Sequence, residues 1–99
     1  MMDKWTLLAL YTLEQQGTMR FNDLRRSIPD VSQKMLTVTL KSMEADGLVS
    51  RKVIPAVPVK VEYTLTDRAM SVMPLLDQLL GWSLEHFGEI IADRQKNLG

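Results

Sequence analysis

The hydrophobic and polar positions of this 99-residue chain change their spacing twice. In the first half, apolar residues recur every three or four positions, which predicts amphipathic helices. Two short stretches then alternate as strands do, and the helical spacing returns until close to the C-terminus. The expected elements are helices at about 4–16, 21–28 and 32–46, a short extended piece at 18–20, strands at 48–54 and 61–65, and a helical region at 66–94. The pattern therefore predicts a mostly α protein with a small β-hairpin, in the α+β class.

Residues that start or stop helices define the ends of the first three. Asp3 is a favourable cap for the first helix, and Gly17 is expected to end it. Pro29 ends the second helix, because the residue before a proline is pushed out of helical geometry. Ser32 caps the third helix, and Gly47 follows it at the position where a left-handed glycine commonly ends a helix.

The last helical region is less regular than the others. It starts after a capping Thr66 or Asp67 and contains Pro74, which is expected to kink or break it. Two glycines farther along weaken it again, so two consecutive helices are an open alternative. From Asp93 onward the chain is polar and is expected to fray.

Two of the predicted helices are joined by a tight turn, which indicates a helix-turn-helix unit at about 21–46. The hairpin that follows, at about 48–65, is then expected to be a wing. The side of the 32–46 helix that faces away from its apolar stripe has no acidic residue. Its positions are Gln33, Lys34, Thr37, Val38 and Lys41. A helix with donors and positive charge in its N-terminal half is suited to enter the groove of a polyanion, although an ordinary solvated face has the same composition.

Charge is distributed unevenly, although the formal net charge of the chain is zero. Residues 20–60 include eight basic and four acidic side chains, whereas residues 61–99 include three basic and six acidic ones. For nucleic-acid binding, the distribution of charge matters more than its sum. The basic middle of the chain therefore indicates one anion-facing side.

Several kinds of chemistry lack the residues that they need. The chain has no cysteine, so no disulfide, zinc ribbon or thiol redox switch is expected. Its single histidine, His86, cannot form a metal cluster alone, and no Gly-rich phosphate loop or catalytic triad pattern occurs. We therefore expect neither an enzyme nor a bound cofactor. No apolar run has the length of a membrane span and no signal peptide opens the chain, so a cytoplasmic protein is expected.

Several segments together carry a resemblance to a known family. They read KWTLL at 4–8, RFNDLRR at 20–26, PDVSQKMLT at 29–37, LKSMEADGL at 40–48, VP at 57–58 and VEYTLT at 61–66. In this combination the chain resembles the HxlR-type winged helix-turn-helix transcriptional regulators of bacteria and archaea. The resemblance implies one winged helix-turn-helix domain over 1–99, with a homodimer formed through the first and C-terminal helices.

This chain departs from the family pattern at two places. Family members usually carry an N-terminal arm, often with a cysteine, before the segment that begins here at Lys4. The thiol-sensing mechanism of some members is therefore not implied for this chain. Ala69 stands where the family commonly has a glycine, which should tighten the last helix without changing the fold.

Double-stranded DNA is the partner expected for the acid-free face of the 32–46 helix and for the wing. Gln33 and Thr37 are the first choices for contacts with base edges, because a Gln amide can pair with adenine and a methyl group can touch thymine. The expected base-contacting residues are Ser32, Gln33, Thr37 and Val38. The expected backbone-contacting residues are Arg25, Arg26, Lys34, Lys41, Arg51, Lys52 and Lys60. Ser32 and Lys34 can alternatively hold phosphates at the helix N-terminus.

A second copy of the chain is the other expected partner. The last helical region has two adjacent apolar stripes, more than a small DNA-reading core can cover, and the first helix also has surplus apolar surface. The expected interface residues are Trp5, Leu7, Tyr11, Leu76, Leu80, Ser83, Leu84, Phe87 and Ile91. In the alternative arrangement, the last helix folds back over its own domain and buries both stripes. An apolar dimer interface can also hold a pocket for a small-molecule effector.

The function predicted from these observations is sequence-specific binding of duplex DNA. The protein would act as a homodimeric transcriptional regulator on a pseudo-palindromic operator. The alternative is a winged-helix module that binds proteins and not DNA, because a fold alone does not define a function.

Overall fold

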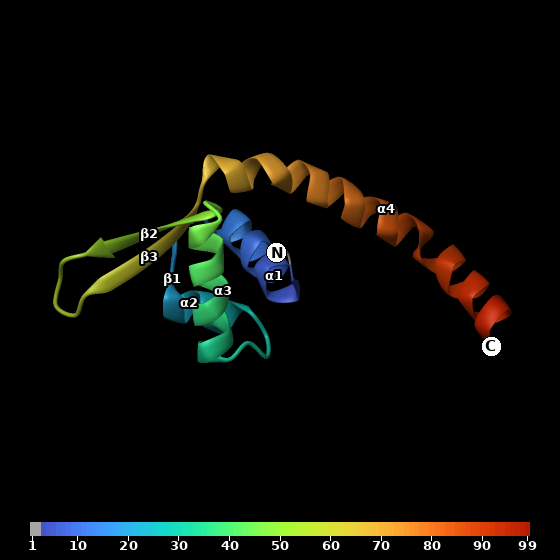
Figure 1. Cartoon of the computed structure of the whole chain (residues 1–99), viewed down its shortest axis with the longest axis horizontal. Helices are drawn as coiled ribbons and strands as arrows, with labels where there is room; N and C mark the ends of the chain where they lie inside the picture. The colour runs from blue at the N-terminus through green and yellow to red at the C-terminus, as the bar shows by residue number, and fades with distance from the viewer. Residues whose placement is uncertain (1–2) are drawn as a thin grey trace.

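The computed structural model describes residues 3–99, and the start of the predicted domain, Met1 and Met2, lies outside the described residues. The described residues form four helices and a three-stranded sheet (Figure 1). The elements are α1 (Lys4–Gln16), β1 (Met19–Arg20), α2 (Phe21–Ser27), α3 (Gln33–Ala45), β2 (Val49–Ile54), β3 (Lys60–Leu65) and α4 (Asp67–Leu98). The mostly α fold with a small hairpin is confirmed. The three short helices gather beside the sheet, and α4 extends away from them as a long arm.

The predicted helix caps are confirmed at all three positions that the sequence indicates. The side chains of Asp3, Ser32 and Thr66 accept hydrogen bonds from main-chain N–H groups three residues farther on, at 2.9, 3.0 and 3.3 Å. The N–H of Thr6 lowers the pKa of the Asp3 carboxyl. Gly17 and Gly47 have φ angles of 79° and 71°, so each ends its helix in a backbone conformation that favours glycine.

The sheet is antiparallel, with the strand order β1-β3-β2. The extended piece expected at 18–20 is the two-residue β1, which pairs with β3 rather than standing alone. Beyond the strand itself, the hydroxyls of Thr18 and Thr64 are 2.8 Å apart. In β2 and β3, Arg51 lies opposite Tyr63 and Lys52 opposite Glu62, so the two basic residues point to opposite faces of the hairpin.

The core lies between the three short helices and one face of the sheet. The buried stripe of α3 consists of Leu36, Leu40 and Met43, as its helical spacing predicts. From the other elements, the core includes Ala9, Leu10, Leu13, Met19, Leu24, Ile28, Val31, Val49, Tyr63, Ala69 and Met73. Leu24 is fully buried on the short α2, which packs against α1 and the sheet. This packing holds α3 with one face inward and the other open.

One helix, α4, differs from what its sequence predicts. It is continuous from Asp67 to Leu98, so a break at Pro74 and the alternative of two consecutive helices are both wrong, and the helix ends at Leu98 and not near residue 94. A proline removes one main-chain donor and bends the axis, but the hydrogen bonds of the turns on either side can still form. The outcome is a long curved helix (Figure 1).

Within residues 3–99, only the first turns of α4 pack on the other elements. Ala69 and Met73 are fully buried, and Val72 and Leu76 are half-buried against the core. Beyond them the apolar side chains of α4 are exposed, as Phe87 is at 62%. The alternative in which α4 folds back and buries both stripes is therefore wrong.

Candidate nucleic-acid interface

The outer face of α3 presents its side chains to solvent. Ser32, Gln33, Lys34, Val38 and Lys41 are all exposed, and Thr37 is half-buried. The Thr37 hydroxyl donates to the Gln33 carbonyl at 2.8 Å, so its methyl group and the acceptor capacity of its oxygen remain to contact a ligand. The Ser32 oxygen accepts from the Met35 N–H, which leaves its hydroxyl proton available for a phosphate. The predicted base-contacting residues therefore share one surface.

The turn between α2 and α3 sets the direction of that surface. Asp30 has a φ of 66°, a left-handed conformation that a short polar side chain tolerates and that reverses the chain tightly. On either side of it, Ile28 and Val31 are buried in the core. Anchored at both ends in this way, the turn holds the N-terminus of α3 out toward solvent.

A hollow of about 340 Å³ separates α3 from the hairpin. It is lined by Thr37, Leu40, Lys41, Glu44, Arg51 and Tyr63. Lys41 comes from the helix and Arg51 from the strand, so two cations from different elements meet there. The Glu44 carboxylate lies in the same hollow and offsets part of their charge. Glu44 and Tyr63 were not predicted as site residues, although Tyr63 could have been found once the register placed it opposite Arg51.

The other basic residues of the hairpin lie elsewhere. Lys52 and Lys60 share the face that is opposite to Arg51, because alternate strand residues point to opposite sides. Lys60 also lines a second hollow, of about 460 Å³, between the hairpin and the start of α2. The structure therefore brings Arg51 to α3 and keeps the two lysines apart from it.

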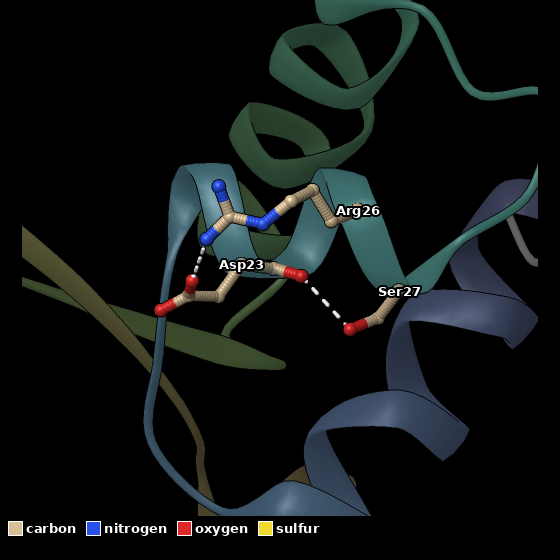
Figure 2. Close-up of polar contacts among 3 residues, drawn as sticks. All are labelled: Asp23, Arg26 and Ser27. Carbon is tan, nitrogen blue, oxygen red and sulfur yellow. Dashed lines mark hydrogen bonds and ion pairs between the residues drawn. The ribbon is translucent and has the colours of Figure 1, made fainter.

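The two arginines of α2 are both exposed on one turn of the helix. The Arg26 guanidinium forms an ion pair with Asp23, and the Ser27 hydroxyl donates to the Asp23 carbonyl at 2.8 Å (Figure 2). Because both partners of the ion pair are exposed, it adds little to stability and water or a phosphate can compete for it. Arg25 therefore adds positive charge on the exposed side of α2, whereas Asp23 offsets the charge of Arg26 until a phosphate competes for it.

The residues predicted for a dimer interface fall into two groups. Trp5, Leu7 and Tyr11 on α1 are half-buried, as are Leu76 and Ser83 on α4. The α1 group lies close to α4, because the two helices pack against each other. Burial and the nearby carboxylates of Asp77 and Glu14 raise the pKa of the Tyr11 hydroxyl.

The exposed interface residues continue along the free part of α4. They are Leu80, Leu84, Phe87 and Ile91. Leu75, Leu79 and Trp82 of the second apolar stripe are exposed as well, although the sequence did not assign them to the interface. The sequence shows that these three residues share one helical stripe. The structure is needed to show that α4 extends away from the other elements, so that no described residue covers them.

A helix-turn-helix with an open outer face on its second helix, followed by a β-hairpin beside that face, defines a winged helix-turn-helix protein of the kind that binds duplex DNA. Across residues 3–99, no helix combines the length and the apolar character that crossing a bilayer requires. The chain belongs to the HxlR-like helix-turn-helix family, whose model matches residues 1–90. It is a DNA-binding transcriptional regulator.

Similar proteins match most of this chain and about two thirds or more of their own length. An HTH-type transcriptional regulator of Methanothermobacter thermautotrophicus is 44% identical over 97% of this chain and 69% of its own. The YkvN regulator of Bacillus subtilis is 48% identical over 80% of this chain and 66% of its own. Among solved structures, the redox regulator HypR in its reduced form superposes with a TM-score of 0.82 at 36% identity, covering 92% of this chain and 89% of its own.

Proposed function

We propose that this regulator acts as a homodimer on a pseudo-palindromic operator, with each α3 reading one half-site in the major groove. The observation that carries the proposal is the exposed, acid-free N-terminal half of α3, held outward by a turn that is anchored in the core. A two-fold dimer would place the two α3 helices about 34–36 Å apart, one turn of the duplex. The exposed apolar side of α4 supplies a surface for the two-fold contact.

Within each half-site, the outer face of α3 would divide its contacts by position. Gln33, at the first turn, has a side-chain amide that matches the acceptor and donor pair of adenine. Thr37 and Val38 offer methyl groups to thymine. The hydroxyl of Ser32 could contact either a base edge or a backbone phosphate. Lys34 and Lys41 flank this group and would bind phosphates, which position the helix without reading sequence.

Backbone contacts outside α3 would come from α2 and the wing. Arg51 is best placed, because it shares a hollow with Lys41, where a single phosphate could meet both cations. Arg25 and Arg26 would contact the phosphates of the DNA strand that lies next to α2. Lys52 and Lys60, on the other face of the hairpin, would contact the backbone beside the wing.

The proposal is tested by selecting bound duplexes from a random pool and measuring their affinity at several salt concentrations. A palindromic consensus would establish both the sequence preference and the two-fold symmetry. Affinity should fall steeply as salt rises, because each phosphate contact releases bound counterions. A protein that enriches no sequence and shows no salt dependence would instead be a protein-interaction module.

Single alanine substitutions in the wing should flatten the salt dependence of binding. Lys52→Ala, Lys60→Ala and Arg51→Ala should each reduce the slope of log K against log salt by roughly one unit, the value for one lost phosphate contact. Titrations of the selected duplex at four or more salt concentrations would measure it. Lys96→Ala, near the exposed end of α4, is the matched control and should leave the slope unchanged. An unchanged slope with weaker binding would show that the wing lysines act on the structure of the hairpin.

Thiol oxidants should not change DNA binding by this chain. Relatives of known structure include a redox regulator, HypR, and YodB after diamide treatment. This sequence has no cysteine, and diamide acts on thiols. Affinity for the selected duplex should be the same before and after brief diamide treatment, measured by fluorescence anisotropy. A prompt loss of affinity would contradict the expectation. A small-molecule effector, held where the two α4 helices meet, would be the remaining kind of signal.

A further inference from the structure

The C-terminal end of α3 is closed by its own main chain. The N–H groups of Gly47 and Leu48 bind back to the carbonyls of Glu44 and Met43, at 3.1 and 2.8 Å. With Gly47 in the left-handed conformation, this is the Schellman arrangement of a helix end. It turns the chain sharply, and the next three carbonyls, those of residues 46, 47 and 48, are left pointing away from α3.

All three of those carbonyls are bound by the start of α4. The Arg68 guanidinium donates to the Asp46 carbonyl at 2.7 Å, and the Thr66 hydroxyl donates to the Gly47 carbonyl at 2.6 Å. The Thr66 N–H donates to the Leu48 carbonyl at 3.1 Å. The same Thr66 oxygen accepts from the N–H of Ala69, so one hydroxyl caps α4 and holds the end of α3.

Arg68 lies directly over the turn. A Cβ atom at Gly47 would be only 2.5 Å from the Arg68 Nη1 atom, so the guanidinium fits because residue 47 has no side chain. A cation at this end of α3 also interacts favourably with the partial negative charge of the last carbonyls. Geometry and charge therefore act together to keep Arg68 in this place.

We propose that Arg68 is a positioning residue, which fixes the direction of α3 relative to α4 and so determines the spacing between the two half-sites. This inference depends on the proposed homodimer. The apolar contacts of α3 with the core have little directional preference, whereas hydrogen bonds to three successive carbonyls, one from Arg68 and two from Thr66, define an orientation. Arg68 is itself exposed and lies at the opposite end of α3 from the proposed base-contacting residues, so we expect it to act on base reading through the direction of α3 and not by contact with a base.

The first test varies the distance between half-sites in the selected palindrome. The wild-type protein should prefer one spacing, and Arg68→Ala should reduce this discrimination by about fivefold or more, a typical coupling between two sites. The base preference within each half-site should not change. Arg68→Lys, which keeps the charge and one donor, should restore part of the discrimination. Arg94→Ala, on the far part of the same helix, is the matched control and should behave as wild type.

The second test measures geometry without DNA. Because the chain has no cysteine, Ser42→Cys on the exposed side of α3 would give one spin label per protomer and one distance between the two α3 helices of a dimer. Adding Arg68→Ala, or Arg68→Gln if the alanine variant does not fold, should widen the distance distribution.

The two tests separate this inference from the proposed function. An Arg68→Ala protein that keeps both the wild-type spacing preference and a narrow distance distribution would overturn the role of Arg68 alone. A wild-type protein with no inter-protomer distance and no preferred spacing would overturn the homodimer, and the role of Arg68 with it.

Discussion

Phe87→Glu should convert the proposed dimer to a folded monomer of 11.3 kDa at micromolar concentration. Phe87 is 62% exposed in a stripe of apolar residues on α4 that no described part of the chain covers. In a two-fold interface this substitution places a carboxylate in each protomer against apolar surface, where an unpaired charge costs several kcal/mol. Two such charges should weaken the dimer by about a thousandfold or more. Sedimentation velocity would measure the mass, and circular dichroism would confirm the fold.

A second apolar-to-acid substitution on α4 tests whether any added carboxylate weakens the dimer, or only one within the predicted interface. Leu98 is also exposed, at 71%, but it is the last residue of the helix and lies outside the predicted interface. Leu98→Glu should therefore remain dimeric. A wild-type mass near 11.3 kDa would rule out the dimer, and a folded Phe87→Glu protein that stays dimeric would place the interface elsewhere.

Gln33→Ala should relax the preference for one base pair in each half-site, at a cost of about 1–3 kcal/mol at that pair. Gln33 is exposed at the first turn of α3, and its side-chain amide is the one group there that can pair with an adenine in two hydrogen bonds. The measurement is the affinity for four duplexes that differ only at the contacted pair. Wild-type protein should discriminate among them, and the variant should bind all four within about threefold.

The neighbouring Lys34→Ala substitution gives the matched contrast. Lys34 is equally exposed, but as a phosphate contact it should weaken every duplex by a similar factor and should not change the order of preference. If Gln33→Ala weakens binding to all four duplexes equally, as Lys34→Ala should, then Gln33 does not read a base.

The helix ends were predictable because their causes are local. A cap such as Ser32 acts on an N–H three residues away, and a glycine such as Gly47 ends a helix through its own φ angle. The continuity of α4 was not predictable in this way. Pro74 is a local signal to break, and whether a helix resumes after a proline depends on the bonds of neighbouring turns and not on one residue.

The candidate site was predictable in part for the same reason. The open face of α3 follows from helical period alone. The strand period would also have placed Arg51 and Lys52 on opposite faces, had it been applied to the basic residues as it was to the apolar ones. The hollow that joins Lys41 to Arg51, and the bonds from Arg68 to the end of α3, depend on how distant segments pack. No spacing in the sequence encodes them.

If the proposed dimer forms through α4, the free length of this helix would make the lifetime of the protein depend on its concentration. From residue 77 onward, 22 residues of helix extend from the domain, where helix propensity alone gives marginal stability in water. A protomer without a partner would therefore open this segment often and expose it to proteases, whereas a paired one would not. Dilution would shorten the lifetime of the regulator and would also lower the fraction of operator sites that it occupies. At lower concentration a larger fraction of the protein would be monomeric and open to proteases. Its degradation would then become faster as its concentration falls.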